Sequence, residues 1–331
     1  MDFAVHTYEL TKTFNGKIVA VSGLNLSVPY GAVYGLIGRN GAGKTTTLRL
    51  LMGLLRPDHG SAHLLSHDLW NTSRHVRQRI AYVSQSQLLP GWMSLNDLCR
   101  LHAYYYPSWD GEFAKRIIKL WELPNDRPIS QLSGGQQRQA AIILALSSRP
   151  ELLLLDEPAA GLDPVARRAL LNGIVEVLAY TSNCTVLFST HIISDLERIA
   201  DTIGIMDRGR LMMSSKLSDL IERTKRVQVV FDQKDPPLDF SIPGIIRCQI
   251  SGPVVTALVS VCSDSQLNPI REMPGVRVNI FPVSLEELFI ELYSPTSKNP
   301  FADGYQQLTD GESEMVSAVL GSYENNIQQK M

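Results

Sequence analysis

A glycine-rich segment at 38–45 constrains the fold of this chain more than any other feature. It reads Gly-Arg-Asn-Gly-Ala-Gly-Lys-Thr, follows an apolar run at 32–37, and precedes a segment at 46–54 with leucines at helical spacing. A buried strand, a glycine-rich loop and a helix in this order are typical of a phosphate-binding loop, because glycines let consecutive N–H groups surround phosphate oxygens and the helix N-terminus adds partial positive charge. Lys44 would supply a fixed charge and Thr45 a hydroxyl for Mg²⁺. The alternative, a turn that binds no nucleotide, leaves both side chains without a role.

Two acidic residues, Asp156 and Glu157, directly follow four consecutive leucines at 152–155. Such a run is buried on both faces when it forms a central parallel strand, and parallel strands present the residues after them at the sheet edge where ligands bind. We expect Asp156 to hold Mg²⁺ and Glu157 to orient the water that attacks the γ-phosphate. An Asp-Glu pair at a strand end is also common as a purely structural feature, so this interpretation depends on the phosphate loop.

A third motif, Leu-Ser-Gly-Gly-Gln at 132–136, opens a strongly helical stretch that continues to residue 147. It offers a second glycine-opened helix N-terminus that can bind an anion. By itself the Ser-Gly-Gly sequence is more often just a flexible helix cap. Together with the other two motifs, it resembles the signature sequence of the ATP-binding cassette (ABC) family.

The resemblance covers roughly residues 3–222 and implies a fold and a site. The fold would be an α/β P-loop NTPase core with a parallel-rich sheet and an inserted helical subdomain. The family pattern assigns ATP binding to Phe14, Gly38, Asn40, Gly41, Gly43, Lys44, Thr45, Thr46, Ser133, Gly135 and Gln136. It assigns catalysis to Gln85, Glu157 and His191, and metal binding to Thr45, Gln85 and Asp156. Asp163 would belong to a loop that contacts the partner in the dimer.

Three of these assignments rest on single residues in short motifs. Phe14 would stack on adenine, Gln85 would reach Mg²⁺ and the attacking water, and His191, 34 residues after Glu157, would contact the γ-phosphate. Each has a simpler reading: a half-buried strand aromatic, a polar residue at a strand end, and an ordinary histidine.

The resemblance also implies a mechanism and partners. Two cassettes would pack head to tail, so that Ser133, Gly135 and Gln136 of one cover the ATP on the phosphate loop of the other. Hydrolysis would then reopen the dimer. The expected partners are a second copy or a homologous ATPase subunit, and separately encoded integral membrane permease subunits. We therefore expect a cytoplasmic protein held peripherally at the inner face of the cell membrane.

The rival interpretation is a soluble ABC ATPase that acts on nucleic acid or ribosomes. Relatives of that kind insert a long coiled coil between phosphate loop and signature or carry two cassettes in one chain. Here Ser133 follows Lys44 by only 89 residues and there is one cassette. No nucleic-acid partner is expected.

Composition agrees with a cytosolic ATPase that is not itself membrane-spanning. The chain has 331 residues, 44% of them hydrophobic, and a net charge of −2, which gives no general attraction to nucleic acid or anionic membrane. Its four cysteines show no metal-ligand or disulfide spacing. No apolar run approaches the ~20 residues that cross a bilayer, and the first residues do not resemble a signal peptide.

The ABC domain is expected at 1–222, with its helical subdomain at about 87–148. Within that subdomain, helices are expected at 95–106 and 112–123, broken by prolines. An aromatic cluster in this region is a candidate docking surface for the membrane partner, unless half of its rings are core; it comprises Tyr104, Tyr105, Tyr106 and Trp109.

A small α+β domain is expected at 223–293. Its strands are expected at 226–232, 245–251, 254–261 and 276–282, and a helix capped by Ser284 follows them. Residues 294–331 are expected to form a flexible tail, in which 312–323 could be a short helix. Similar extensions occur on bacterial cassettes that serve exporter-type membrane subunits.

Overall fold

The computed structural model describes residues 3–86, 89–181, 184–232, 245–259 and 264–293. The chain divides into two compact units between Leu217 and Ser218. The first unit carries all three phosphate-related motifs. The domain boundaries expected at 222 and 293 stay predictions.

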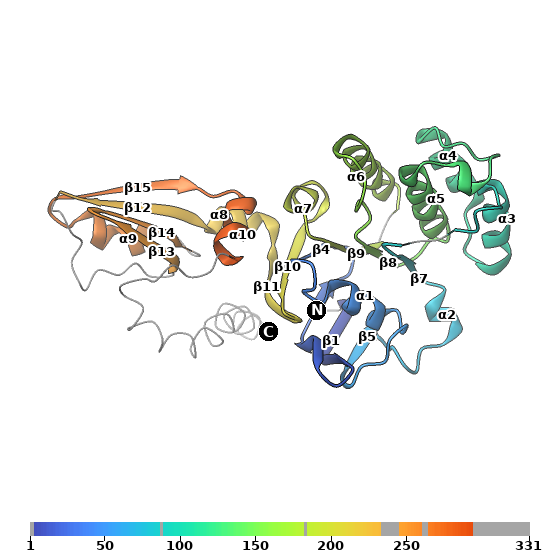
Figure 1. Ribbon diagram of the computed structural model, residues 1–331, viewed down its shortest axis with the longest axis horizontal. Coiled ribbons are helices and arrows are strands. Elements are labelled where there is room, and N and C mark those ends of the chain that lie inside the picture. The colour runs from blue at the N-terminus through green and yellow to red at the C-terminus, as the bar shows by residue number, and fades with distance from the viewer. Residues whose placement is uncertain (1–2, 87–88, 182–183, 233–244, 260–263, 294–331) are drawn as a thin grey trace, which may run out of the picture. The chain divides into compact units, whose positions relative to one another are not determined.

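A six-stranded sheet forms the centre of the first unit, in the order β11-β10-β4-β9-β8-β7 (Figure 1). All neighbouring pairs are parallel except β10 and β11. The strands are β4 Val33–Ile37, β7 Ile80–Val83, β8 Leu152–Asp156, β9 Thr185–Thr190, β10 Thr202–Asp207 and β11 Arg210–Lys216. Every residue of β8 is buried, as expected of a leucine run in a central parallel strand. The expected parallel-rich core is confirmed.

A second, antiparallel sheet lies at the N-terminal end of this unit and was not among the sequence-based expectations. Its strands are β1 Phe3–Phe14, β2 Ile18–Leu24, β3 Ser27–Pro29, β5 His59–Leu64 and β6 His67–Asp68. Strand β1 is its hub, because it pairs with β2, β3 and β5.

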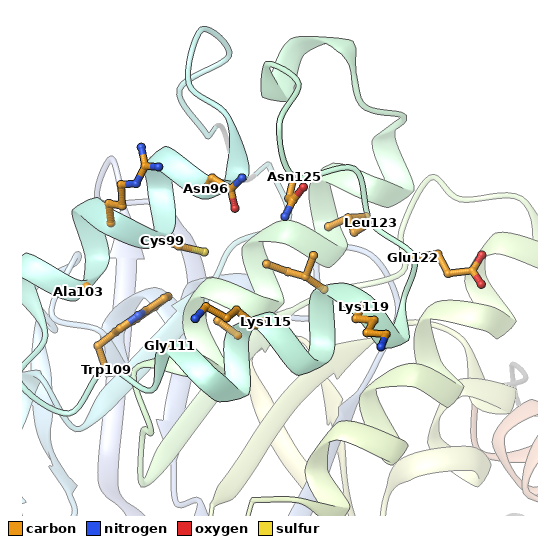
Figure 2. Close-up of a pocket in the computed structure, with 13 residues that line it drawn as sticks. Asn96, Cys99, Ala103, Trp109, Gly111, Lys115, Lys119, Glu122, Leu123 and Asn125 are labelled. Atoms are coloured by element: carbon orange, nitrogen blue, oxygen red, sulfur yellow. The ribbon is translucent and has the colours of Figure 1, made fainter.

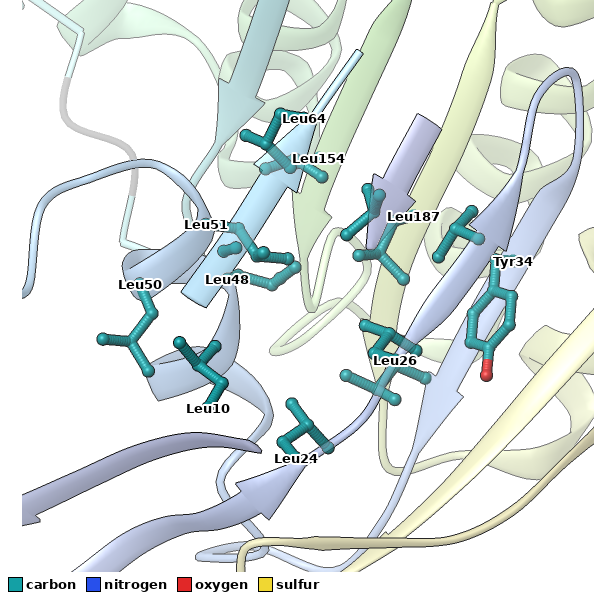
Figure 3. Close-up of a cluster of buried hydrophobic side chains, with 14 of the residues drawn as sticks. Leu10, Leu24, Leu26, Tyr34, Leu48, Leu50, Leu51, Leu64, Leu154 and Leu187 are labelled. Atoms are coloured by element: carbon teal, nitrogen blue, oxygen red, sulfur yellow. The ribbon is translucent and has the colours of Figure 1, made fainter. Parts of the chain in front are cut away.

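One hydrophobic cluster joins the two sheets through helix α1, Lys44–Leu51 (Figure 3). The helix contributes Leu48, Leu50 and Leu51, which are fully buried. Leu24 comes from the antiparallel sheet and Leu154 from β8. Burying a leucine side chain contributes about 1.5–3 kcal/mol, so this cluster fixes α1, and with it the phosphate loop, relative to the end of β8.

The helical subdomain consists of α3 Leu95–Tyr105, α4 Gly111–Leu120, the 3₁₀ turn η1 Ile129–Gln131 and α5 Gly134–Ser147; the short α2, Arg74–Arg77, precedes β7. Side chains cap each of the three long helices: Ser94 accepts from Asp97 N, Asp110 from Phe113 N, and Ser133 from Gln136 N. Helices α6, Pro164–Ala179, and α7, Ile193–Ile199, complete the unit.

The aromatic cluster of the helical subdomain is divided between surface and interior. Tyr104 and Tyr105 are exposed, whereas Tyr106 and Trp109 are partly buried and contact the ring of His102. The four rings therefore form neither a continuous aromatic surface nor part of the core, and docking of the membrane partner on them stays a prediction.

The second unit has a four-stranded antiparallel sheet in the order β13-β14-β12-β15. The strands are β12 Lys225–Phe231, β13 Ile245–Ser251, β14 Val254–Val259 and β15 Val276–Pro282; the helices are α8 Leu217–Arg223, α9 Asp264–Arg271 and α10 Leu285–Tyr293. Ser284 and Glu287 form the expected cap, since Glu287 N donates to Ser284 Oγ at 3.2 Å. The expected small α+β fold is confirmed. The tail at 294–331, including 312–323, lies outside the described residues.

No helix in the described part of the chain combines the length and the apolar character needed to cross a membrane.

Candidate functional site

The phosphate loop connects β4 to α1 in a shape that only glycines allow. Gly41 and Gly43 have φ angles of +85° and +103°, in the left-handed region that other residues rarely adopt. A Cβ on Gly43 would lie 2.3 Å from the carbonyl oxygen of Ala20, and one on Gly38 would lie 2.4 Å from that of Met206. Gly43 is also the N-cap of α1 and provides no side-chain acceptor for the first N–H groups of the helix. These N–H groups are therefore available to an anion.

Lys44 lies along this loop with its ammonium group buried. Its Nζ donates to the carbonyl oxygens of Gly38 at 2.7 Å and Arg39 at 3.3 Å, and lies 3.5 Å from Glu157 Oε1. Burial lowers the pKa of Lys44, and the nearby Glu157 carboxylate acts in the opposite direction. An anion beside the ammonium therefore stabilises its charge.

Asp156, the last residue of β8, accepts hydrogen bonds from hydroxyl groups on three other elements. Thr45 Oγ1 and Ser189 Oγ donate to its Oδ1 at 3.0 and 2.7 Å, and Tyr82 Oη donates to Oδ2 at 3.5 Å. Burial raises the pKa of Tyr82 to about 12, so its hydroxyl remains a donor at neutral pH. Hydroxyl and carboxylate oxygens are the ligand class that Mg²⁺ prefers, so the donor set around Asp156 fits this ion. The described residues contain no cluster of three His, Cys, Asp or Glu side chains suited to another metal.

Glu157 stands on a strained turn and faces three of the expected site residues. Its φ angle is +45°, a conformation that costs a non-glycine residue roughly 1 kcal/mol or more and is frequent at functional sites. Its Oε2 lies 3.1 Å from His191 Nδ1 and accepts from Gln85 Nε2 at 3.5 Å, while Oε1 pairs with Lys44. On the backbone side, Glu157 N donates to Ser189 Oγ at 3.0 Å. Parallel strand order explains the arrangement, because β7, β8, β9 and β4 are neighbours and end at one sheet edge.

The remaining predicted residues lie outside this cluster. Phe14 ends β1, and Lys12 Nζ is 5.9 Å from its ring centroid. Ser133 and Gln136 cap each other at the start of α5, and Asp163 caps α6. Within the described ranges, none of their hydrogen bonds reaches the cluster around Lys44 and Glu157. Asn40 and Thr46 lie on the exposed loop and in the first turn of α1.

Three site residues were missed by the sequence reasoning. Tyr82 and Ser189 occupy strand positions where a single sequence gives no signal beyond burial. Arg138, in α5, donates from Nη1 to the carbonyl oxygens of Glu157 at 3.1 Å and Pro158 at 3.2 Å, and from Nη2 to that of Gln85 at 3.0 Å. Its position two residues after Gln136 was the only available signal, and it does not reveal these partners.

A separate groove of about 680 Å³ lies between α3 and α4 in the helical subdomain (Figure 2). Cys99 and Ala103 of α3 face it from one side, and Lys115 of α4 from the other. Trp109, from the aromatic cluster, closes one end. None of the residues around Glu157 lines this groove, so it is not part of the phosphate site.

Comparison with known sequences gives family relationships over nearly the whole chain. The ABC transporter family model matches residues 21–160. The ABC transporter ATP-binding protein YtrB of Bacillus subtilis is 30% identical over 284 residues, which cover 85% of this chain and 95% of YtrB. Nod factor export ATP-binding protein I of Cupriavidus metallidurans is 32% identical over 285 residues, covering 84% of this chain and 93% of that protein.

Solved structures agree with this relationship. The ATP-binding subunit of an ABC transporter aligns with a TM-score of 0.58 at 27% identity, over 66% of this chain and 92% of that one. A dimeric ATP-binding cassette in a post-hydrolysis state, bound to ADP and Pi, aligns with a TM-score of 0.56 at 26% identity, over 64% of this chain and 98% of that one. These similarities support the transporter interpretation and give no support to the nucleic-acid alternative. The chain belongs to the ABC transporter family, as an ATP-binding and ATP-hydrolysing subunit.

Proposed function

We propose that two copies of this chain, or one copy and a homologous subunit, close head to tail around Mg-ATP, hydrolyse it at Glu157, and drive separately encoded membrane subunits. One observation carries the proposal: Lys44 and Thr45 of the phosphate loop lie within hydrogen-bond or ion-pair distance of the Asp156–Glu157 pair. A buried ammonium, a hydroxyl and two carboxylates thus lie together at one sheet edge.

The phosphate loop and Lys44 would bind the β- and γ-phosphates. In the structure the Lys44 ammonium pairs with Glu157 at 3.5 Å. A phosphate oxygen beside the ammonium would compete with this carboxylate, because both are anions that seek the same buried charge. Binding of ATP would therefore release Glu157 for contact with a water molecule.

Thr45 Oγ1, the Asp156 carboxylate and the Gln85 amide oxygen would hold Mg²⁺. When bound, the ion would neutralise phosphate charge and stabilise the charge that develops during phosphoryl transfer. Thr45 and Asp156 already lie 3.0 Å apart, so both oxygens face the same point.

Glu157 would orient the attacking water and accept its proton as the oxygen attacks phosphorus. Gln85 and His191, whose nitrogens lie 3.5 and 3.1 Å from Glu157 Oε2, would fix the direction of the carboxylate. The leaving group is ADP, and the second product is phosphate. Loss of the γ-phosphate would weaken the attraction between the two subunits.

The start of α5 would cover the ATP of the partner. Ser133, Gly135 and Gln136 lie at the N-terminus of this helix, where the helix dipole favours negative charge and where Ser133 and Gln136 cap each other. Asp163, at the start of α6, would belong to the loop that crosses to the partner. Adenine would stack on Phe14.

The groove between α3 and α4 would receive a helical segment of the membrane subunit. It combines apolar positions such as Ala103 and Ile118 with a charged rim that includes Arg100 and Lys119. Binding there would hold the protein at the inner face of the cell membrane. Cys99 lines the groove and provides a native position for cross-linking to engineered cysteines of that subunit. The relative named for Nod factor export supports an exporter.

The Glu157→Gln variant tests the proposal directly. It keeps the ATP-binding residues but removes the proton acceptor, so it should form a long-lived dimer with Mg-ATP and a monomer with ADP, measured by light scattering. The double variant Lys44→Ala, Glu157→Gln should remain monomeric, because nucleotide binding is lost. A Glu157→Gln protein that stays monomeric at saturating Mg-ATP, even with its membrane subunit present, would overturn the proposal.

A further inference from the structure

Arg138 connects two catalytic segments that are distant in the sequence. It lies in α5, whose N-terminus carries Ser133, and its side chain is partly buried. One guanidinium nitrogen, Nη1, donates to two successive carbonyl oxygens after β8, at 3.1 and 3.2 Å. The other, Nη2, donates to the carbonyl oxygen of Gln85 after β7, at 3.0 Å. Gln85 and Glu157 are 72 residues apart in the sequence.

This use of an arginine differs from an ion pair. In the described part of the chain Arg138 forms no salt bridge, and its hydrogen-bond partners there are the backbone carbonyl oxygens of Gln85, Glu157 and Pro158. A guanidinium group carries its donors in a rigid planar fork, so it can bind two segments at a fixed separation, which the single ammonium of lysine cannot do. The guanidinium group of Arg138 therefore sets the distance between the backbone segments after β7 and β8.

Glu157 needs such support because its backbone conformation is unfavourable. Its φ angle of +45° persists only where surrounding contacts hold it. Ser189 binds the N–H of Glu157 through its hydroxyl and carbonyl oxygens, at 3.0 and 3.2 Å. Arg138 binds the carbonyl oxygen of the same residue. The two contacts fix the turn from both sides and hence the direction of the carboxylate.

Resting on the proposed function, we propose that Arg138 is a positioning residue for ATP hydrolysis, which holds the backbones of Gln85 and Glu157 in the geometry that directs their side chains to the attacking water. Among the described residues, its hydrogen bonds go to the segments after β7 and β8 and not to the phosphate loop, so we expect its effect in the chemical step and not in ATP binding. Because Ser133 caps α5, the Arg138 side chain also fixes the positions of Gln85 and Glu157 relative to the helix proposed to cover the partner's ATP.

The test compares Arg138→Ala and Arg138→Lys with Arg149→Lys in steady-state ATPase assays. Arg149 is a matched control, because it donates to Asp110 at 2.7 Å and, among the described residues, forms no hydrogen bond with Gln85 or Glu157. A displacement of about 1 Å at a reacting group can cost about 10²-fold in rate. We expect kcat to fall by about that factor in Arg138→Ala and by at least about tenfold in Arg138→Lys, with KM for ATP within about twofold. Arg149→Lys should keep the wild-type kcat.

Two further measurements separate positioning from folding and closure. Amide hydrogen exchange should accelerate in peptides that contain Gln85 and Glu157 when Arg138 is replaced, and remain unchanged elsewhere in the first unit. ATP-dependent dimerisation should persist when Arg138→Lys is combined with Glu157→Gln, because the start of α5 is intact. Loss of that dimer would mean that Arg138 acts in closure and would overturn the positioning role.

The outcomes also distinguish this proposal from the proposed function. A normal kcat in Arg138→Ala, or full activity in Arg138→Lys, would overturn the positioning role of Arg138. If Glu157→Gln still lost turnover, the assignment of Glu157 to hydrolysis would stand. Normal turnover in Glu157→Gln would instead remove the proposed function itself.

Discussion

Replacing Ser189 by alanine tests the hydrogen-bond network that joins the two acidic residues of the site. The Ser189 side chain is fully buried at the end of β9. Its hydroxyl donates to Asp156 Oδ1 at 2.7 Å and accepts from Glu157 N at 3.0 Å. Alanine removes both bonds and almost no volume, so the change isolates the network from packing.

The expected loss of stability follows from the hydrogen bonds that Asp156 and Glu157 N keep in the Ser189→Ala variant. Asp156 keeps Thr45 and Tyr82 as donors, at 3.0 and 3.5 Å, and Glu157 N keeps the carbonyl oxygen of Ser189 at 3.2 Å. The main loss is one hydrogen bond to a charged group, which contributes about 1.5–3 kcal/mol to the free energy of unfolding. For a unit of this size, that corresponds to a fall in melting temperature of roughly 3–12 °C. We also expect a lower kcat, because Glu157 loses one of the contacts that fix its backbone.

Ser147→Ala is the matched control, measured by differential scanning calorimetry and ATPase assay beside Ser189→Ala. Ser147 is equally buried, but its Oγ has no hydrogen-bond partner among the described residues. Its removal should leave the melting temperature unchanged or raise it, since an unsatisfied buried hydroxyl is itself unfavourable. Equal melting temperatures for the two variants would refute the stabilising role of the Ser189 hydroxyl.

Three further changes test other parts of the site. Lys44→Ala should weaken ATP binding at least about tenfold in a fluorescent-nucleotide titration, because a charge-assisted bond to phosphate contributes more than about 1.4 kcal/mol; unchanged affinity would contradict the phosphate-loop assignment. Gly43→Ala should lower both ATP affinity and melting temperature, because its Cβ would lie 2.3 Å from a backbone oxygen; a fully active variant would show that the loop relaxes freely. Arg167 donates two hydrogen bonds to the carboxylate of Asp195, which is only 4% exposed, so Arg167→Ala should lower the free energy of unfolding by about 3 kcal/mol, measured by urea denaturation. The exposed neighbour provides the control, because Arg168→Ala should change the unfolding free energy by less than about 0.5 kcal/mol, and equal losses would refute the ion-pair argument.

Much of the fold around the site could be predicted because its signals are local. The glycines of 38–45, the leucines of 152–155 and the cap at Ser133 each specify backbone conformation within a few residues. In the structure β4 ends just before the glycine-rich loop, and β8 and α5 lie at the other two segments, with ends shifted by one or two residues from those expected. Helix ends depend on caps: α4 begins at Gly111, one residue before the expected start, because Asp110 is its N-cap.

The antiparallel N-terminal sheet could not be predicted in the same way. Strand β1 pairs with three partners, and β5 lies beyond the phosphate loop in the sequence. Pairing between strands so far apart depends on which surfaces the folded chain brings together, and the hydrophobic pattern of one strand does not encode its partner. The resemblance to the ABC family predicted the parallel core sheet, but the residue pattern did not predict the antiparallel sheet.

The sequence by itself indicated four residues, Lys44, Thr45, Asp156 and Glu157, whose side chains have the chemistry to bind phosphate, a metal ion and a water molecule, because this chemistry belongs to single side chains and short loops. Only the tertiary structure decided which groups hold them in place. Ser189 and Arg138 acquire their roles from a sheet order in which β7, β8, β9 and β4 are neighbours. Hydrogen bonds act over about 3 Å, so a contact between residues 72 positions apart exists only once the strands have assembled.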